Sequence, residues 1–321
     1  MKSYTHLTLT EREIIAERMN EGKSFRDIAK ELGRSPSTIS REVKRNYSKK
    51  KNRYKPWRAT TLYILRRRAC RRKRILDIDP KLKAYILDRL KRYWSPEMIA
   101  ARARREGYQI STSTIYHAIK NKVFGVNAPR AYLRRRDVRK YTRNASKSGF
   151  KPEHTIYERP IECETKERFG DFEGDTVLGA PGKGCLVTFV DRKSKLLVAC
   201  KCDNKIPANI RRAIENAFRL SDLPFAVKTI TLDRGSEFSD FKGIEEDLGA
   251  TLYFCDPHAP WQRGLNESTN DMLRFFFPKG CNFHDISDEE IARVVSIIND
   301  RPRKCLGYLS PLEFLSKKCC T

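Results

Sequence analysis

The chain has 321 residues, of which 39% are hydrophobic and 33% are charged, which is enough for two or three domains with a sizeable core. Its formal net charge is +26, and all of the excess lies in residues 1–150, which carry 41 Lys and Arg against 13 Asp and Glu. Residues 151–321 carry 25 basic and 27 acidic residues. This asymmetry predicts a polyanion as partner of the first half. It argues against a ribosomal or membrane-surface protein, neither of which needs a nearly neutral second half.

The ten cysteines do not indicate a secreted, disulfide-stabilised protein. They are scattered without a CxxC pair, and the polar first residues do not resemble a signal peptide. We therefore expect reduced thiols in a cytoplasmic protein. No apolar run reaches the roughly 18 residues that a membrane-spanning helix needs, so we expect a soluble protein without a membrane partner.

Residues 1–47 are predicted to form a helix-turn-helix DNA-binding domain. Thr10 and Glu13 have the spacing of a capping box for a first helix, Ser24 is placed to cap a second, and a third runs over residues 36–45. The alternative is an ordinary three-helix packing unit, but the basic surplus downstream favours DNA binding. The polar and basic residues expected to face DNA on the third helix are Ser37, Thr38, Ser40, Arg41 and Lys44.

Residues 48–79 contain the run RRRACRRKR and are predicted to be a basic linker, or a basic helix laid against phosphates, without a core of their own. Tyr54 and Trp57 lie in this segment. Their aromatic rings either stack on bases or anchor the segment to a neighbouring element, and the sequence leaves both alternatives open.

Residues 80–125 are predicted to form a second helix-turn-helix module. Its helices are expected to begin at Pro80, at Pro96 after a Ser95 cap, and after Ser111, with Tyr116 facing inward. A second basic linker is expected over residues 126–154, with a domain boundary near residue 155. The residues of this module expected to face DNA are Thr112, Ser113 and Lys120.

Residues 155–321 alternate between strand and helix patterns, which on their own indicate a mixed α/β domain. The last helix is marked by Ile291, Val294, Val295 and Ile298, which recur at helical spacing. Strands are expected near residues 172–179, 184–191, 195–202, 226–232 and 251–255, and helices near residues 207–220, 241–248, from about 265 onward, and 288–299.

Three acids occupy positions in these elements that can converge. Asp175 lies on the first strand, Asp233 follows the fourth, and Glu267 lies in the first turn of a helix, with 33 residues between the last two acids. Side chains at the carboxyl ends of strands often share a site, and carboxylates suit Mg²⁺, which prefers oxygen ligands. Two such ions can clamp the attacking and leaving oxygens of a phosphodiester displacement. For Glu267 alone, the alternative is a charge that complements the helix dipole.

Five segments carry a family resemblance. The stretches GDFEGDTVLG, VDRKSK, TLDRGSEF, PWQRGLNESTNDMLRFFFPKG and NDRPRKCLGYLSPLEF, in this order, resemble the catalytic domain of bacterial insertion-sequence transposases of the insertion-sequence thirty family. The resemblance implies helix-turn-helix modules followed by a ribonuclease H-like integrase core. It also implies that Asp175, Asp233 and Glu267 form the catalytic Asp-Asp-Glu set. By family position, this set ranks above the neighbouring acids, which are Asp171, Glu173 and Glu237.

A member of this family is expected to be a metal-dependent DNA transposase. Two Mg²⁺ or Mn²⁺ ions would be held by the three acids, and the partners would be the terminal inverted repeats of the element and a target DNA. A dimer or higher oligomer on DNA is expected, in a bacterial cytoplasm and associated with the nucleoid. The residues near Glu267 that are candidates for holding the DNA end, or otherwise for packing the loop, are Trp261, Gln262, Arg263 and Asn266.

The sequence departs from the family pattern at two positions. Phe172 stands where the family usually has Trp, and Arg234 stands where Asn usually follows the second Asp. A cation beside Asp233 either competes with the metal or binds a DNA phosphate, and phosphate binding is the expected role. Two alternatives to a transposase remain open: a DNA-binding regulator with a catalytically decayed core, and a metal-dependent nuclease of the same fold that cuts without joining.

Overall fold

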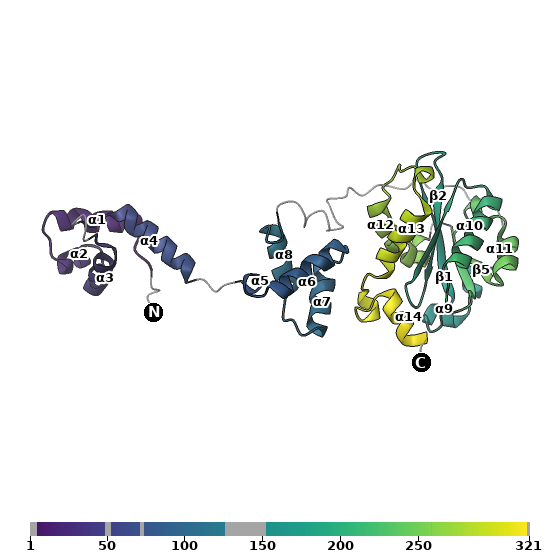
Figure 1. Ribbon diagram of the computed structural model, residues 1–321, viewed down its shortest axis with the longest axis horizontal. Helices are drawn as coiled ribbons and strands as arrows, with labels where there is room; N and C mark the ends of the chain where they lie inside the picture. The colour runs from purple at the N-terminus through teal and green to yellow at the C-terminus, as the bar shows by residue number, and fades with distance from the viewer. Residues whose placement is uncertain (1–4, 49–52, 71–73, 126–151, 258, 320–321) are drawn as a thin grey trace. The chain divides into compact units, whose positions relative to one another are not determined.

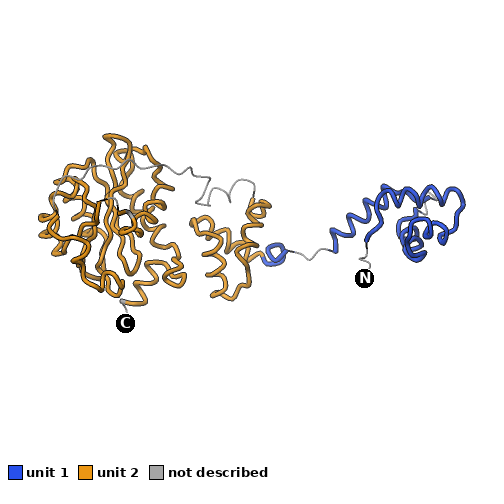
Figure 2. Tube along the Cα trace, turned by 180° about the vertical axis from the view of Figure 1, so that it is seen from behind, with its two compact units in different colours: residues 1–79 blue, residues 80–321 orange. Residues whose placement is uncertain are grey.

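The computed structural model of the chain describes residues 5–48, 53–70, 74–125, 152–257 and 259–319 (Figure 1). The chain divides into two compact units, residues 1–79 and 80–321 (Figure 2). Most of the predicted second linker, residues 126–151, lies outside the described residues, and the division into five parts stays a prediction. No helix of the described residues is long and apolar enough to cross a bilayer, and the eight cysteines described with their side chains are free thiols.

The first unit begins with the three predicted helices, α1 (Leu9–Asn20), α2 (Phe25–Glu31) and α3 (Pro36–Asn46). Ile15, Ile28 and Ile39, one from each helix, are fully buried in their shared core. On α3, Val43 and Asn46 are also buried, and the polar residues between these positions face outward.

The first helix starts two residues earlier than expected, so the predicted capping box at Thr10 and Glu13 is wrong. The box is formed by Thr8 and Glu11: the Glu11 N–H donates to Oγ1 of Thr8 at 3.1 Å, and the Thr8 N–H donates to Oε2 of Glu11 at 2.7 Å. Both pairs have the same spacing in the sequence. The burial of Leu7 directly before Thr8 decides between them, because it fixes where the chain enters the helix.

The basic segment after α3 is a helix and not only a linker. Helix α4 (Pro56–Ala69) packs on α1 and α3, with Ala59 in their core. Tyr54, just before it, is buried and its hydroxyl donates to Oε1 of Glu42 at 3.1 Å, so Tyr54 anchors the segment, whereas Trp57 is exposed. Of the two expected alternatives, a linker or a basic helix without a core of its own, the structure has the helix, which docks on the core of α1 to α3. A short helix, α5 (Ile75–Ile78), ends the unit.

The second unit opens with the predicted helical module, α6 (Pro80–Lys91), α7 (Pro96–Arg105) and α8 (Thr112–Lys120). Ser95 and Ser111 cap α7 and α8 as expected. Tyr116 is 49% exposed, so its predicted inward position is wrong. Ala118 takes the core position instead, because consecutive helical residues are rotated by about 100° and Ile115 and Ile119 define the buried side.

A five-stranded mixed sheet forms the centre of residues 152–319, with the strand order β3-β2-β1-β4-β5. Strands β1, β2 and β3 are antiparallel, while β4 and β5 run parallel to β1. Every strand predicted from the sequence is present, within three residues at each end. The strands are β1 (Asp171–Leu178), β2 (Cys185–Asp191), β3 (Leu197–Cys202), β4 (Thr229–Leu232) and β5 (Thr251–Phe254).

Helices cover both faces of this sheet (Figure 1). One face packs on α10 and α11, and the other on α12 and α13. The arrangement agrees with the expected ribonuclease H-like order. The helices are α9 (Ile161–Thr165), α10 (Pro207–Leu220), α11 (Phe241–Leu248), α12 (Gly264–Phe276), α13 (Asp288–Asn299) and α14 (Pro311–Cys319).

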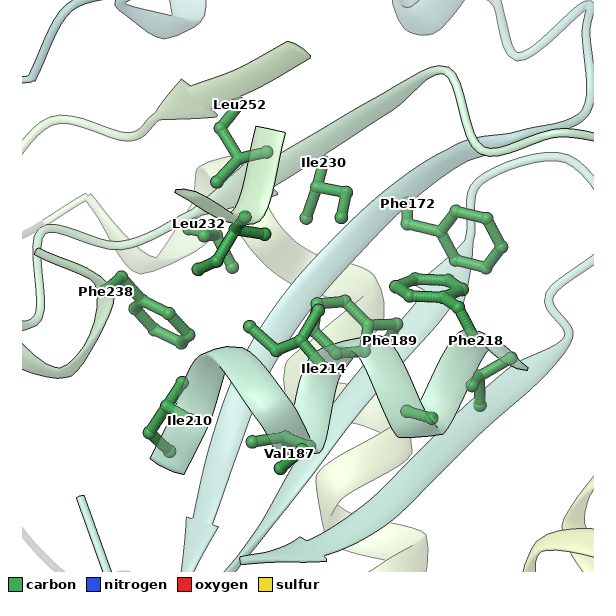
Figure 3. Close-up of a cluster of buried hydrophobic side chains, with 14 of the residues drawn as sticks. Phe172, Val187, Phe189, Ile210, Ile214, Phe218, Ile230, Leu232, Phe238 and Leu252 are labelled. Atoms are coloured by element: carbon green, nitrogen blue, oxygen red, sulfur yellow. The ribbon is translucent and has the colours of Figure 1, made fainter. Parts of the chain in front are cut away.

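Strand β1 separates an apolar face from an acidic one. Phe172 points into the core beside Phe218 of α10, with the ring centroids 5.0 Å apart (Figure 3). Gly174 follows on the same face, where an added Cβ would lie 2.6 Å from Cδ2 of Leu232. Because side chains alternate along a strand, Asp171, Glu173 and Asp175 all lie on the opposite face, toward α12.

Candidate active site

Asp175 and Asp233 lie side by side on neighbouring parallel strands. The β1–β4 pairing ends at Glu173 opposite Thr231, and two residues further along each chain are Asp175 and Asp233. Paired residues of parallel strands point to the same side of a sheet, so the two carboxylates meet at the end of β4. The sheet topology thus joins two acids that are 58 residues apart in the chain.

Arg263 lies between these two carboxylates. Its Nη2 donates to Oδ2 of Asp233 at 2.8 Å, and its Nη1 lies 3.4 Å from Oδ1 of Asp175. The same Nη1 donates to the carbonyl of Gly174 at 2.8 Å. The Arg263 side chain is 13% exposed, which makes these carboxylates its main polar surroundings. The sequence indicated a DNA contact for Arg263, and nothing in its spacing predicted this bridge.

Asp175 is held by two further donors. The Asn270 amide donates to its Oδ2 at 2.7 Å, and the N–H of Thr176 donates to its Oδ1 at 2.9 Å. Burial raises the pKa of Asp175 above its usual value, against the opposing effect of the Arg263 charge. Asn270 is a site residue that sequence reasoning missed. Its position one helical turn after Glu267 was the available signal, since residues three apart on a helix are neighbours.

Glu267 lies in the first turn of α12, where it was expected, and its side chain is exposed. Within the described residues, no three or more His, Cys, Asp or Glu side chains are arranged closely enough to hold a metal ion. Of the three acids expected to converge, the described structure brings Asp175 and Asp233 together, and Glu267 is not part of that cluster. Glu267 is connected to them through its helix, because Asn270, three residues on, contacts Asp175.

The three neighbouring acids are committed to structural contacts. Oδ2 and Oδ1 of Asp171 accept hydrogen bonds from the Arg168 guanidinium at 2.9 and 3.1 Å. Glu173 pairs with Arg192 at 2.8 Å and accepts the N–H of Leu265 at 3.1 Å, so it fixes the start of α12 to β1. The third acid, Glu237, pairs with Lys205 at 2.6 Å.

The loop before α12 contains the other candidates for DNA contact. Trp261 is 75% exposed. The Gln262 side chain accepts the N–H of Asp256 at 2.9 Å and donates to its Oδ2 at 3.0 Å, so it packs the loop. Asn266 is 1% exposed, so the structure does not present it to a DNA end.

Arg234 is turned toward strand β5 and its loop. Its Nε donates to the carbonyl of Cys255 at 3.0 Å, and its Nη2 lies 3.7 Å from Oδ1 of Asp256. Neither of the two expected roles, metal competition beside Asp233 or phosphate binding, corresponds to these contacts. Arg234 instead ties the end of β4 to the end of β5.

The candidate DNA-facing residues of the helical modules lie where the patterns placed them. On α3, Arg41 is exposed and folds back on its own helix, donating from Nε to the Ser37 carbonyl at 3.1 Å and from Nη2 to its Oγ at 3.2 Å. The exposed members of the predicted set are Ser37, Arg41, Lys44, Ser113 and Lys120, and the partly exposed ones are Thr38, Ser40 and Thr112.

Two families of known protein domains match this chain, one at the first three helices and one in the region of the sheet. Residues 3–46 match the Helix-turn-helix domain family, and residues 167–260, which end before Glu267, match the Integrase core domain family. A solved structure, the catalytic core domain of BIV integrase, aligns with 46% of this chain and 95% of its own at 17% identity, with a TM-score of 0.35.

Relatives over nearly the whole chain identify the family. The chain is 35% identical over 317 residues to the transposase for insertion sequence element IS4351 of Bacteroides fragilis, covering 96% of this chain and 94% of that one. It is 33% identical over 334 residues to transposase InsI for insertion sequence element IS30A of Escherichia coli (strain K12), covering 98% and 85%. With a helix-turn-helix domain, an integrase-type core and these relatives, the chain belongs to the IS30 family of insertion-sequence transposases.

Proposed function

We propose that this transposase binds the terminal inverted repeats of its own insertion sequence and cleaves and joins DNA strands at Asp175, Asp233 and Glu267. The observation that supports this most directly is the pair of carboxylates at the end of β4, with Arg263 between them. The two acids lie on the sheet of an integrase core and hold a cation between them. A cation held there can also neutralise the negative charge of a phosphate during the reaction.

The residues fit a divalent metal by their chemistry. Both aspartates offer hard oxygen atoms, and a cationic group already lies between them. We assign Asp175, Asp233 and Glu267 as the metal-holding residues, with Mg²⁺ or Mn²⁺ as the ion and two ions expected. When bound, such ions supply charge neutralisation at the scissile phosphate and activation of the attacking oxygen.

The other residues of the site hold these acids in place. Asn270 orients the Asp175 carboxylate, and Glu173 fixes the start of the helix that carries Glu267. A water is expected to attack the phosphodiester at the element end, and the freed 3′-hydroxyl then attacks the target DNA. Neither step needs a protein nucleophile, so catalysis depends on positioning and on charge.

DNA binding is assigned to the first half of the chain. It carries the whole charge excess, and the exposed residues of α3 and α8 lie on its helical modules. We expect a dimer or higher oligomer on DNA, because two element ends must be handled together, in a nucleoid-associated cytoplasmic protein. Arg234 was the reason to consider a decayed, regulatory core. Since it binds Cys255 and Asp256, it no longer supports that alternative.

The deciding experiment supplies labelled element ends and a supercoiled target to the purified full chain with Mg²⁺. Asp175→Asn, Asp233→Asn and Glu267→Gln should each abolish cleavage and leave binding of the repeat intact in a mobility-shift assay. Glu246→Gln, an exposed acid on α11, is the matched control and should keep full activity. Cleavage without joined product would identify a nuclease. Repeat binding without cleavage by the wild type would identify a regulator.

A further inference from the structure

The two aspartates have few acceptor positions left besides those that Arg263 occupies. Oδ2 of Asp175 accepts from Asn270 and its Oδ1 accepts the N–H of Thr176, while Oδ1 of Asp233 accepts the N–H of Gly235 at 3.2 Å. The oxygens nearest to Arg263 are Oδ1 of Asp175 and Oδ2 of Asp233, one from each strand. The guanidinium thus lies at the position where the two carboxylates can share a cation.

A divalent ion that bridges these two oxygens would take the place that the guanidinium occupies. A ligand oxygen lies about 2.0–2.6 Å from a bound Mg²⁺ or Ca²⁺ and a similar distance from other hard cations. Nη2 of Arg263 already stands 2.8 Å from Oδ2 of Asp233, in the space that such an ion requires. The positive charge of Arg263 also repels an approaching cation. We therefore expect an ion that bridges the two aspartates to displace the Arg263 side chain.

Arg263 lies at a junction between two elements outside the sheet. Arg263 is the last residue of a short 3₁₀ turn (Pro260–Arg263), before α12 begins at Gly264. A Cβ added at Gly264 would meet no atom within 4 Å, so there is open space beside the junction. The start of α12 is fixed separately, by the hydrogen bond from Leu265 to Glu173.

We propose that Arg263 is a built-in competitor of the metal: it pairs the two aspartates before the metal arrives and sets the metal concentration that the site requires. This inference rests on the proposed function, since it takes Asp175 and Asp233 as metal ligands. It assigns to Arg263 the metal-competing role that was, for Arg234, the alternative to the expected phosphate binding. Without Arg263, the aspartates would repel each other in the metal-free protein and bind a metal more tightly once it is present.

The test measures binding of Mn²⁺ alone to the full chain, without DNA, by titration calorimetry and by the electron paramagnetic resonance signal of free Mn²⁺. Arg263→Gln removes the charge and should lower the dissociation constant about tenfold. Arg263→Lys keeps the charge but loses the planar fork that reaches three acceptors, and a two- to threefold decrease is expected. Thermal unfolding in a chelator gives a second readout. Arg263→Gln should melt below the wild type and gain more from added Mn²⁺.

Two controls separate the possible failures. Arg234→Gln removes a positive charge next to Asp233 that contacts neither aspartate in a described interaction, and should change Mn²⁺ affinity less than about twofold. Asp175→Asn should weaken Mn²⁺ binding strongly. If it does not, the proposed metal site itself is wrong. If it does, but Arg263→Gln binds Mn²⁺ no more tightly than the wild type, or Arg234→Gln tightens binding equally, the competitor role is wrong. Should Arg263→Gln fail to fold, Arg263→Lys decides, and an affinity at or below that of the wild type overturns the proposal.

Discussion

Asn270 and Asp175, which are 95 residues apart in the chain, are joined by a hydrogen bond of 2.7 Å from the amide nitrogen to Oδ2. It is a direct contact between the helix that carries Glu267 and the strand that carries Asp175. The hydroxyl of Thr188, on β2, donates to Oδ1 of Asn270 at 3.4 Å. The contact therefore holds the orientation of Asp175 from the side opposite to Arg263.

Replacing Asn270 should reduce catalysis without reducing DNA binding. Asn270→Ala leaves Asp175 without its amide donor, and the loss of a hydrogen bond to a charged group is worth roughly 1.5–3 kcal/mol, which corresponds to about 10- to 100-fold in cleavage rate. Cleavage of a labelled element end and mobility shift of the same DNA provide the two measurements. Ser268→Ala, an exposed position on the same helix, is the control. A normal cleavage rate in Asn270→Ala would show that Asp175 is oriented by other groups.

Arg234→Asn restores the usual family residue and should not change the metal requirement. Its contacts are with Cys255 and Asp256, so the variant loses a bond between β4 and β5 and is expected to lose about 1 kcal/mol of stability. The concentration of Mg²⁺ for half-maximal cleavage and the affinity for the element end should both stay within twofold of the wild type. A clear drop in the Mg²⁺ requirement would mean that Arg234 reaches the metal site in solution.

Arg41 on α3 should contribute to DNA binding through its charge. Arg41→Ala is expected to weaken binding of the element end and to reduce the slope of log affinity against log salt by about one, because one phosphate contact is lost. Arg293→Ala, an exposed arginine in the nearly neutral second half, should leave the slope unchanged. The measurement is a series of fluorescence-anisotropy titrations at increasing salt. Equal slopes for Arg41→Ala and the wild type would place Arg41 away from the backbone phosphates.

Asp191 should make stability depend on pH in the acidic range. It is fully buried at the end of β2, and burial raises the pKa of Asp191 although the N–H and hydroxyl of Ser194 both donate to it at 2.6 Å. The folded protein therefore keeps this proton to a higher pH than the unfolded chain. The stability that the protonated form contributes is fully present below the ordinary carboxyl pKa of about 4. It is lost as the pH rises through the raised pKa that Asp191 has in the folded protein.

Asp191→Asn removes this titration. The free energy of unfolding of the variant should therefore rise relative to that of the wild type as the pH increases from about 4 through the raised pKa of Asp191. Ser194→Ala removes a hydroxyl donor that lowers the pKa of Asp191. In this variant, the loss of stability with rising pH should be larger than in the wild type. Urea unfolding followed by circular dichroism at a series of pH values measures both. The assignment fails if the difference between Asp191→Asn and the wild type shrinks as the pH rises.

Local signals in the sequence were sufficient for the secondary structure of most of the chain. Helices α11 and α13 have the bounds that their apolar spacing predicted, and Ser24, Ser95 and Ser111 cap the helices that they precede. These features depend on residues within one or two turns of each other, so the sequence contains the information directly. Where two local solutions were equivalent, as for the capping boxes at Thr8 and Thr10, burial of a neighbouring residue made the choice.

The position of Asp175 on a strand and of Asp233 after another were also readable in the sequence, and with them the approach of these two of the three acids expected to converge. The partners of those acids were not. Arg263 reaches Asp175 and Gly174 across 88 and 89 residues, Asn270 reaches Asp175 across 95, and Arg234 turns to Cys255 across 21. Each contact depends on which strands are adjacent and on how α12 lies across them. The positions of residues along the chain do not determine which strands are adjacent or how a helix crosses them. Only the tertiary structure therefore decided that the cation between the aspartates is Arg263 and not Arg234.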